Sequence, residues 1–594
     1  MGSALERIES VLRTPDLVLL DLSRDDERAL ALSNLSGSHQ LWAFGVRDGG
    51  ARQVTHGDQR VTHAAIAPDS RSVAFARDFG GAERHQLFLT SLEGEPEVVQ
   101  VSEFEELRVS GLAWSPKMDE LAVTGSTSRS NVLIVHDLRS RSSEVLFESR
   151  GWVFSPAWHE RGDVIAASAV TTEVPRSSEL VFVHVDDGSA EVFTPKPGSE
   201  NVEPRWHPSD PKVLFKTNSA GEYDIAVHDL ESESTQLLGL SGYGVDFTDF
   251  GWLGEGGDVW FAAKRRGRTR LCVRRRDGSV EELPATEGTL SGVSFDGSGS
   301  VGAFTWSSLS RPPALFRLDV KSRSVSEVYS VKAPEGLELS RAEFVTYRSF
   351  DGLEVPAFLV LHSGLRDRRA CVVWVHGGPW SEVADEWNAA IQAISVAGFH
   401  VLCPNFRGST GYGAEFERMN VGDPGGRDLM DVLRGVEFLR REGLLDDDRV
   451  AIVGASYGGF MAFLAMVKHP EVWRAGAAIV GVTDWEEMYR LSDAAFRNFI
   501  EQLLGKPEAR PELFRDRSPI NFVHRIRAPI LVWHRANDSR CPLRPVVRFV
   551  ERLKELGRPH EFHVVEGEGH GPQRLENFVR QYKAVVDFLL RHLS

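Results

Sequence analysis

The sequence predicts two domains, an N-terminal seven-bladed β-propeller and a C-terminal α/β domain with a doubly wound, mostly parallel sheet. Three observations predict this fold class. A chain of 594 residues is long enough for several domains. In the first half, a strand pattern repeats about every 45 residues. After residue 371, continuous apolar strands separated by helical stretches replace that pattern.

The repeat in the first half is built from short strands and polar turns. One element is a strand often followed by Asp or Asp-Gly, as in "QLWAFGVRDGG" (40–50), "VLIVHDL" (132–138) and "ALFRLDV" (314–320). Between the copies lies a second element, such as "WSPKMDELAVT" (114–124), with an aromatic or aliphatic residue, a turn and an alternating strand. A unit of about 45 residues is the size of a four-stranded blade, and adjacent blades bury each other's faces. Seven copies predict seven blades over residues 22–332, with an array of β-sandwiches as the alternative.

The segments on either side of the repeat have a different character. Residues 1–21 carry Leu5, Ile8 and Leu12 at helical spacing, so we expect a helix that extends the C-terminal domain and packs on it. Residues 333–594 begin with a hairpin that turns at Asp-Gly and continue with apolar strands such as "CVVWVHGG" and "VAIVGAS". Such strands, alternating with helices, predict a parallel sheet that is covered on both faces.

The composition excludes several classes of partner. A net charge of −17 argues against nucleic acid or an anionic membrane, since both attract Lys and Arg. One basic run, from Lys264 to Arg276, is expected to be a solvated strand face. No apolar run approaches the about 18 residues of a membrane span, and the N-terminus lacks the pattern of a signal peptide. We therefore expect a cytoplasmic protein without a membrane or nucleic-acid partner. Whether it forms a homo-oligomer stays open.

The four cysteines give no sign of a metal site. They lie far apart, without the spacing of metal ligands, at Cys272, Cys371, Cys403 and Cys541. A disulfide framework is not expected in so large a chain. We expect no metal and no cofactor.

A serine between glycines marks the candidate nucleophile. In "VAIVGASYGGFMAFLAM" (450–466), Ser456 has glycines two residues before it and two and three residues after it. The glycine pattern alone is a weak signal, and a plain tight turn is the alternative. An apolar strand before it and a helix after it, however, are the setting of a nucleophile elbow. The second domain is therefore predicted to have the α/β-hydrolase fold.

A serine nucleophile needs a base and an orienting carboxylate, which in this fold follow in the chain order Ser, Asp or Glu, His. Asp538 comes just after the strand "ILVWHRA", and His570 lies in the Gly-rich loop after "HEFHVV". Both lie where the carboxyl ends of neighbouring strands should converge. Each alone could be a turn residue. The weaker candidates lie in helices or loops, in a strand, or at the chain end, and are Asp484, Asp493, Asp516, His534 and His592.

An oxyanion hole needs two N–H donors. The backbone N–H of Tyr457, directly after the serine, is expected to be one. The glycine loop in "VWVHGGPW" (373–380) is expected to supply the other from Gly378, with a plain strand-to-loop turn as the alternative.

Five segments together resemble the prolyl oligopeptidase family of serine peptidases, and most closely its acylaminoacyl-peptidase branch. They are HGGP (376–379), NFRGSTGYG (405–413), GASYGG (454–459), NDSRCP (537–542) and GEGHG (567–571). Two further stretches, "RDFGGAERHQLF" (77–88) and "DWEEMYRLSDAAFRNFIEQLLG" (484–505), are similar to that branch in particular. The resemblance covers the whole chain. One departure, Phe406 where relatives often carry Tyr, is not expected to matter.

The resemblance implies roles for individual residues. Ser456, Asp538 and His570 would be the catalytic triad, with Gly378 and Tyr457 as oxyanion donors. An S1 pocket would be formed by Val482, Trp485, Phe496, Phe499 and Ile500, of which the last three share one helix face by spacing. Packing in the core is the alternative for that face. Arg540 and Glu83 would pair across the domain interface beside the site, and the alternative for them is a solvated surface pair.

The sequence thus favours a serine peptidase that releases an N-acylated residue from short peptides, with a bulky apolar residue at P1. A propeller covering the catalytic face would exclude folded proteins, an expectation drawn from the family. The alternatives are an esterase with the same triad, a dipeptidyl peptidase or oligopeptidase in which Glu105 and Glu106 bind a free amine, and a propeller interaction protein with an inactive hydrolase domain.

Overall fold

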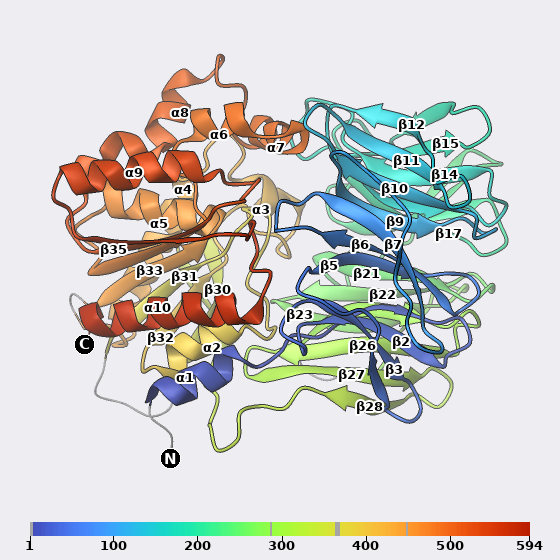
Figure 1. The fold of residues 1–594 in the computed structure, drawn as a ribbon, viewed down its shortest axis with the longest axis horizontal. Helices are drawn as coiled ribbons and strands as arrows, with labels where there is room; N and C mark the ends of the chain where they lie inside the picture. The colour runs from blue at the N-terminus through green and yellow to red at the C-terminus, as the bar shows by residue number, and fades with distance from the viewer. Residues whose placement is uncertain (1–3, 285–287, 363–368, 447–448, 594) are drawn as a thin grey trace.

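The computed structural model describes residues 4–284, 288–362, 369–446 and 449–593. Figure 1 shows a β-propeller and an α/β domain side by side, as the sequence predicts. Residues 1–3 of the expected N-terminal extension lie outside the described residues.

The propeller contains, within the described ranges, seven four-stranded antiparallel sheets, each made of consecutive strands. The strands of the first four blades are β1 (Val18–Leu22), β2 (Arg28–Ser33), β3 (Gln40–Gly45), β4 (Ala51–Gln53), β5 (Val61–Ile66), β6 (Ser72–Asp78), β7 (His85–Ser91), β8 (Val99–Gln100), β9 (Arg108–Trp114), β10 (Glu120–Ser126), β11 (Asn131–Asp137), β12 (Ser143–Ser149), β13 (Val153–Trp158), β14 (Val164–Ala169), β15 (Glu179–His184) and β16 (Ala190–Phe193). The strands of the last three are β17 (Asn201–Trp206), β18 (Lys212–Thr217), β19 (Asp224–Asp229), β20 (Ser234–Leu237), β21 (Asp246–Leu253), β22 (Asp258–Arg265), β23 (Arg268–Arg274), β24 (Val280–Glu282), β25 (Thr289–Phe295), β26 (Val301–Ser308), β27 (Arg311–Asp319) and β28 (Ser324–Ser330).

The first blade begins earlier than the sequence indicated. β1 pairs with β2 with Val18 opposite Leu32, so the propeller starts at Val18 rather than at residue 22. The predicted boundary after residue 332 falls between β28 and the first strand of the α/β domain.

The repeated tryptophans of the sequence link adjacent blades. The indole of Trp114 donates to the Ala65 carbonyl at 3.0 Å, and the indole of Trp252 donates to the Arg205 carbonyl at 3.1 Å. Each acceptor lies in the preceding blade, about one repeat earlier in the chain. The aromatic residue of the second repeat element therefore ties blades to one another and does not serve only as core.

The α/β domain is built on a sheet with the order β29-β30-β32-β31-β33-β34-β35-β36 among the residues described. Its strands are β29 (Arg341–Arg348), β30 (Glu354–Leu361), β31 (Cys371–Val375), β32 (His400–Pro404), β33 (Val450–Ala455), β34 (Ala475–Ile479), β35 (Ile530–Arg535) and β36 (His560–Val565). β29, β30 and β32 form antiparallel pairs at one edge, and the strands from β32 to β36 are parallel.

Helices cover both faces of this sheet, as expected for a buried parallel sheet. One face carries α1 (Ala4–Leu12), α2 (Ala389–Val396) and α10 (Leu575–Leu593). The other carries α4 (Arg427–Arg441), α5 (Tyr457–Lys468) and α9 (Leu543–Glu555). The shorter elements are α3 (Ala414–Arg418), α6 (Trp485–Leu491), α7 (Ala494–Leu504), α8 (Pro511–Arg517) and the 3-10 helix Pro519–Arg525. The N-terminal helix α1 packs on α2 and α10, so it extends this domain as expected (Figure 1).

The basic run of the sequence is not simply solvated. Lys264 is buried and pairs with Glu382 of the α/β domain, and Arg268 pairs with Asp385 at 2.9 Å. The expected solvated face is wrong at these positions because the β22–β23 hairpin meets the α/β domain.

Candidate active site

Ser456 lies on a strained turn between β33 and α5. Its φ is 58°, which is uncommon for a residue other than glycine. The turn also brings backbones very close together. A Cβ on Gly458 would lie 2.0 Å from the Val375 carbonyl oxygen, and one on Gly454 would lie 2.4 Å from the Gly458 carbonyl oxygen. The glycines are required by this close approach, and the strand–turn–helix setting is the geometry of a nucleophile elbow.

The structure brings Ser456, His570 and Asp538 together. His570 Nε2 lies 2.9 Å from Ser456 Oγ, and His570 Nδ1 lies 2.9 Å from Asp538 Oδ2. Asp538 follows β35 and His570 follows β36, so adjacent parallel strands deliver both side chains to the same edge of the sheet. Asp538 Oδ1 also accepts the N–H groups of Arg540 and Cys541 at 3.0 and 2.8 Å. Burial opposes the charge of Asp538, but His570 outweighs it, and the pKa of Asp538 lies below its usual value.

The two expected oxyanion donors lie next to Ser456. Tyr457 is the first residue of α5, where a helix N–H has no intrahelical acceptor. Gly377 packs against the serine, since a Cβ there would be 3.4 Å from Ser456 Cβ. The His376 Nδ1 donates to the Gly377 carbonyl at 2.7 Å. Because the peptide is trans, the N–H of Gly378 points away from the His376 ring.

The side chain of Tyr457 fixes the residue after the nucleophile. Its hydroxyl donates to Asp428 Oδ2 at 2.5 Å and accepts the Gly425 N–H at 3.2 Å. Burial raises the pKa of the Asp428 carboxyl to about 7. This clamp was not anticipated from the sequence, since Asp428 is one of many acids in a predicted helix.

The predicted S1 residues divide into two layers. Phe496 and Phe499 of α7 are partly exposed and contact each other with ring centroids 5.9 Å apart. Trp380, in the loop after β31, meets Phe499 edge to face at 5.5 Å. The other three predicted residues are buried in the core, namely Val482, Trp485 and Ile500. They belong to the same apolar cluster against which Phe496 and Phe499 pack, and their role in the S1 pocket stays a prediction.

The predicted pair Glu83–Arg540 crosses the domain interface beside the triad. Arg540 Nε lies 2.9 and 3.0 Å from the two carboxylate oxygens of Glu83, and the Ser539 hydroxyl donates to Glu83 Oε2 at 2.7 Å. Burial opposes ionisation, yet Arg540 and Arg108 hold the pKa of Glu83 well below its usual range. The alternative of a solvated surface pair fails, because the Glu83 side chain is 3% exposed.

Two propeller residues at this site were missed by sequence reasoning. The guanidinium of Arg108 lies 3.0 Å from Asp493, the N-cap of α7, and 4.7 Å from the centre of the Phe496 ring. The indole of Trp152 donates to the Ala495 carbonyl at 2.9 Å. Both residues hold the aromatic helix α7 against the propeller. They lie hundreds of residues away from α7 in the chain, and no motif marks them.

No group of three or more His, Cys, Asp or Glu side chains that could hold a metal occurs among the residues described. In the same part of the chain, no helix is long and apolar enough to cross a membrane. All four cysteines are buried and unbridged.

Comparison with known proteins identifies the second domain. Residues 385–594 match the model of the prolyl oligopeptidase family. The match lies within the second domain and includes Ser456, Asp538 and His570. The chain is thus a serine peptidase, and the resemblance seen in its motifs is confirmed.

Three similar proteins are named after different peptidase or hydrolase activities. Dipeptidyl aminopeptidase BIII from Pseudoxanthomonas mexicana is 27% identical over 631 residues, covering 99% of this chain and 88% of the relative. The acylaminoacyl peptidase of Pyrococcus horikoshii has a TM-score of 0.76 at 21% identity, covering 99% of this chain and 97% of that one. A puromycin hydrolase structure has a TM-score of 0.86 at 18% identity, covering 99% and 96%. These structural likenesses show the shared two-domain fold.

Proposed function

We propose that Ser456 is the nucleophile of this peptidase and forms an acyl-enzyme with the P1 residue of a peptide. His570 takes the serine proton during attack and gives it to the leaving amine, while Asp538 orients the imidazole. The N–H groups of Tyr457 and Gly378 stabilise the negative oxygen of the tetrahedral intermediate. The observation that supports this mechanism is the continuous Ser456–His570–Asp538 chain of contacts, each 2.9 Å long.

We infer further that the residue before the scissile bond is N-acylated. On the side of the site that faces α7, two of the acids are already occupied by arginines. Glu83 pairs with Arg540, and Asp493 pairs with Arg108. The free ammonium of a substrate would find no uncompensated carboxylate in these two ion pairs. A neutral acyl group would not need a carboxylate partner. The two guanidiniums are instead suited to donate to an acyl carbonyl oxygen.

The aromatic wall supports a bulky apolar P1 residue. Phe496, Phe499 and Trp380 offer ring surface and no charged group of their own, so burial of an apolar side chain against them lowers the free energy of the bound state.

Hydrolysis of acetyl-Phe p-nitroanilide tests the proposal. Wild type is expected to cleave it with a higher kcat/KM than acetyl-Lys or acetyl-Asp p-nitroanilide. Ser456→Ala is expected to be inactive, and a fluorophosphonate should label wild type only. Retained activity in Ser456→Ala, or a preference for Lys or Asp at P1, would reject it. A non-catalytic propeller protein would show no labelling.

A dipeptidyl peptidase is the second candidate, because one observation favours it. Glu106 lines a cavity of about 570 Å³ at the domain seam, together with Asp538 and Ser539. A carboxylate there could receive a free amine, and one full-length relative is named a dipeptidyl aminopeptidase. Loss of activity on Gly-Phe p-nitroanilide in Glu106→Gln would support this candidate. An esterase remains a third reading of the same triad, and matched ester and amide substrates separate it by their kcat/KM ratio.

A further inference from the structure

A second cavity is lined by residues that are direct neighbours of the nucleophile. This acidic cavity has a volume of about 230 Å³ and is lined by Gly377, Ala455, Glu382, Glu386, Trp387 and Asn388 among others. Ala455 directly precedes the nucleophile, and Gly377 packs against it. The volume is below the ~300 Å³ at which pockets for drug-sized ligands begin, so it suits one side chain.

The acidic cavity and the predicted S1 residues belong to opposite faces of the central sheet. The apolar walls of the cavity, including Val383 and Trp387, belong to the core on the α2 and α10 face of the sheet. The predicted S1 residues Val482, Trp485 and Ile500 belong to the core on the other face. A P1 side chain held in S1 therefore directs the next residue of the peptide toward the acidic cavity.

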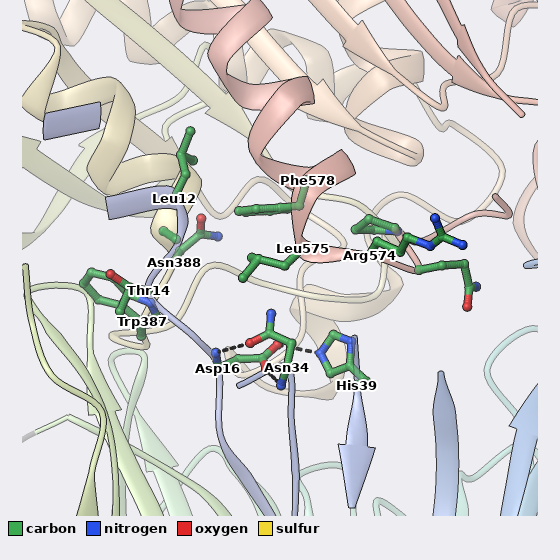
Figure 2. A pocket seen from close by; sticks show the side chains of 13 residues that line it. Leu12, Thr14, Asp16, Asn34, His39, Trp387, Asn388, Arg574, Leu575 and Phe578 are labelled. Carbon is green, nitrogen blue, oxygen red and sulfur yellow. Dashed lines mark hydrogen bonds and ion pairs between the residues drawn. The ribbon is translucent and has the colours of Figure 1, made fainter. Parts of the chain in front are cut away.

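The segment after His570 borders the same region. Trp387 and Asn388 also line a neighbouring cavity of about 250 Å³. Figure 2 shows them in that cavity together with Leu575 and Phe578, two residues that follow His570 closely in the chain. In the proposed mechanism His570 protonates the leaving amine, and the segment that follows it shares the neighbouring cavity with Trp387 and Asn388 of the acidic cavity.

The charges in the acidic cavity do not balance. Glu382 and Glu386 share one nearby base, Lys264, which contacts Glu382 Oε1. The side chain of Glu382 is 7% exposed, and its Oε2 has no hydrogen-bond partner. Glu386 is exposed, with no ion-pair partner in the part of the chain that the structure describes. Burial lowers the pKa of His376 to about 4, so this lining residue adds no positive charge at neutral pH. One carboxylate is therefore in excess.

We propose that the acidic cavity is the subsite for the first residue of the leaving peptide and that it takes a cationic side chain, lysine or arginine. The ammonium or guanidinium would supply the missing countercharge to Glu386 and Glu382, and the stem would lie along Trp387. The inference rests on the proposed peptidase mechanism and adds a substrate class to it.

Matched acyl dipeptide amides test the subsite. Acetyl-Phe-Lys amide and acetyl-Phe-norleucine amide have side chains of similar length and differ in the terminal ammonium. Wild type is expected to cleave the lysine peptide with about tenfold higher kcat/KM, the size expected for a charge-assisted contact. Acetyl-Phe-Glu amide should be cleaved more slowly than either. Equal values for lysine and norleucine would overturn the inference.

Single substitutions test whether Glu386 causes the preference for lysine. Glu386→Gln is expected to reduce the lysine-to-norleucine ratio to about twofold or less, since it removes the exposed carboxylate. Glu415→Gln, which removes the same charge from an exposed position on α3, should keep the ratio of wild type. A ratio that survives in Glu386→Gln would contradict the assignment.

A measurement on wild type tests the subsite without relying on variants, which can fail to fold. Raising NaCl from 0.05 to 1 M should lower the lysine-to-norleucine ratio, because salt screens an exposed carboxylate. An unchanged ratio would count against the subsite. If wild type cleaves acetyl-Phe p-nitroanilide but shows no lysine preference, only the subsite is wrong. If it cleaves none of these substrates, the proposed function fails as well.

Discussion

The acids on the two sides of Ser456 have the same chemistry but opposite surroundings. On the side of α7, Glu83 is bound by Arg540 and a hydroxyl, and its pKa lies below the usual value. On the side of α2, Glu382 and Glu386 share Lys264, and burial raises the pKa of Glu382. The number of basic partners, and not the residue type, decides whether an acid can receive a substrate cation. We therefore expect the acyl side to exclude a cation and the leaving side to accept one.

The largest expected effect is a loss of activity that should be the same for substrates read by either side of Ser456. Asp538→Asn removes the carboxylate that orients His570 and should lower kcat by about 10⁴-fold on every substrate. Because both sides use the same triad, the lysine-to-norleucine ratio should stay as in wild type wherever residual activity is measurable. Steady-state kinetics on acetyl-Phe p-nitroanilide measures the loss. A loss of less than tenfold would contradict the assigned role of Asp538.

Removing a basic partner on the side of α7 should make the acids on the two sides of Ser456 behave alike. Arg540→Met leaves the buried Glu83 without its main partner, so the site gains an uncompensated carboxylate. The ratio of kcat/KM for Gly-Phe over acetyl-Phe p-nitroanilide is expected to rise by about tenfold. The free energy of unfolding should fall by about 2 kcal/mol, a discounted value because Arg540 is 40% exposed.

A surface arginine provides the control for Arg540→Met. Arg591 pairs with Glu561 at 2.7 Å but is 55% exposed, so Arg591→Met should cost less than about 1 kcal/mol in urea unfolding. It should not change the ratio of the two substrates. An equal effect of both variants on that ratio would show that pairing at Glu83 does not control selectivity.

The aromatic wall formed by Phe496, Phe499 and Trp380 is expected to determine which side chain is preferred at P1. Phe499→Ala should lower the kcat/KM ratio of acetyl-Phe over acetyl-Ala p-nitroanilide by about tenfold, since apolar surface in the pocket is lost. The lysine preference at the leaving residue should persist. Tyr243→Ala, at an exposed aromatic position on the propeller, is the control and should change neither ratio. If Phe499→Ala loses activity on both substrates but keeps the preference for Phe over Ala, the aromatic wall does not form the P1 pocket.

The smallest expected effect is a pH dependence confined to the leaving side. The raised pKa of Glu382 means that this group takes up a proton before an ordinary glutamate does as pH falls. The cavity then loses negative charge, so the lysine-to-norleucine ratio should fall by about twofold to threefold between pH 7.5 and pH 5.5. Because both substrates are cleaved by the same triad, their ratio cancels any pH effect on the catalytic step itself. A ratio that rises toward low pH would contradict the sign of this argument.

Much of the fold and of the triad could be predicted because the signals are local. The aromatic or aliphatic residue of each repeat precedes a turn and a strand, and the strand before Ser456 and the helix after it identify the elbow. Asp538 and His570 follow apolar strands in the chain order of the fold. The start of the first blade was misplaced because β1 is short and has a polar residue at Asp21.

The remaining features depend on how the two domains meet. Arg108 and Trp152 contact α7 only after docking, so nothing near them in the chain marks them. Lys264 is buried for the same reason, although its neighbours are basic. The i, i+3, i+4 spacing of α7 identified a shared face correctly but could not tell that Ile500 is core while Phe499 is exposed.

The central claim is that the acyl side takes a neutral acyl group and refuses an amine. Acetyl-Phe and Gly-Phe p-nitroanilide differ at that end by a single ammonium group, so their kcat/KM ratio on wild type is the most direct measurement. We expect a ratio of at least about one hundred in favour of acetyl-Phe, since Arg540 and Arg108 already pair with Glu83 and Asp493 and leave neither acid free for an ammonium. A ratio below one, with Gly-Phe activity lost in Glu106→Gln, would contradict it and assign the chain to dipeptidyl cleavage.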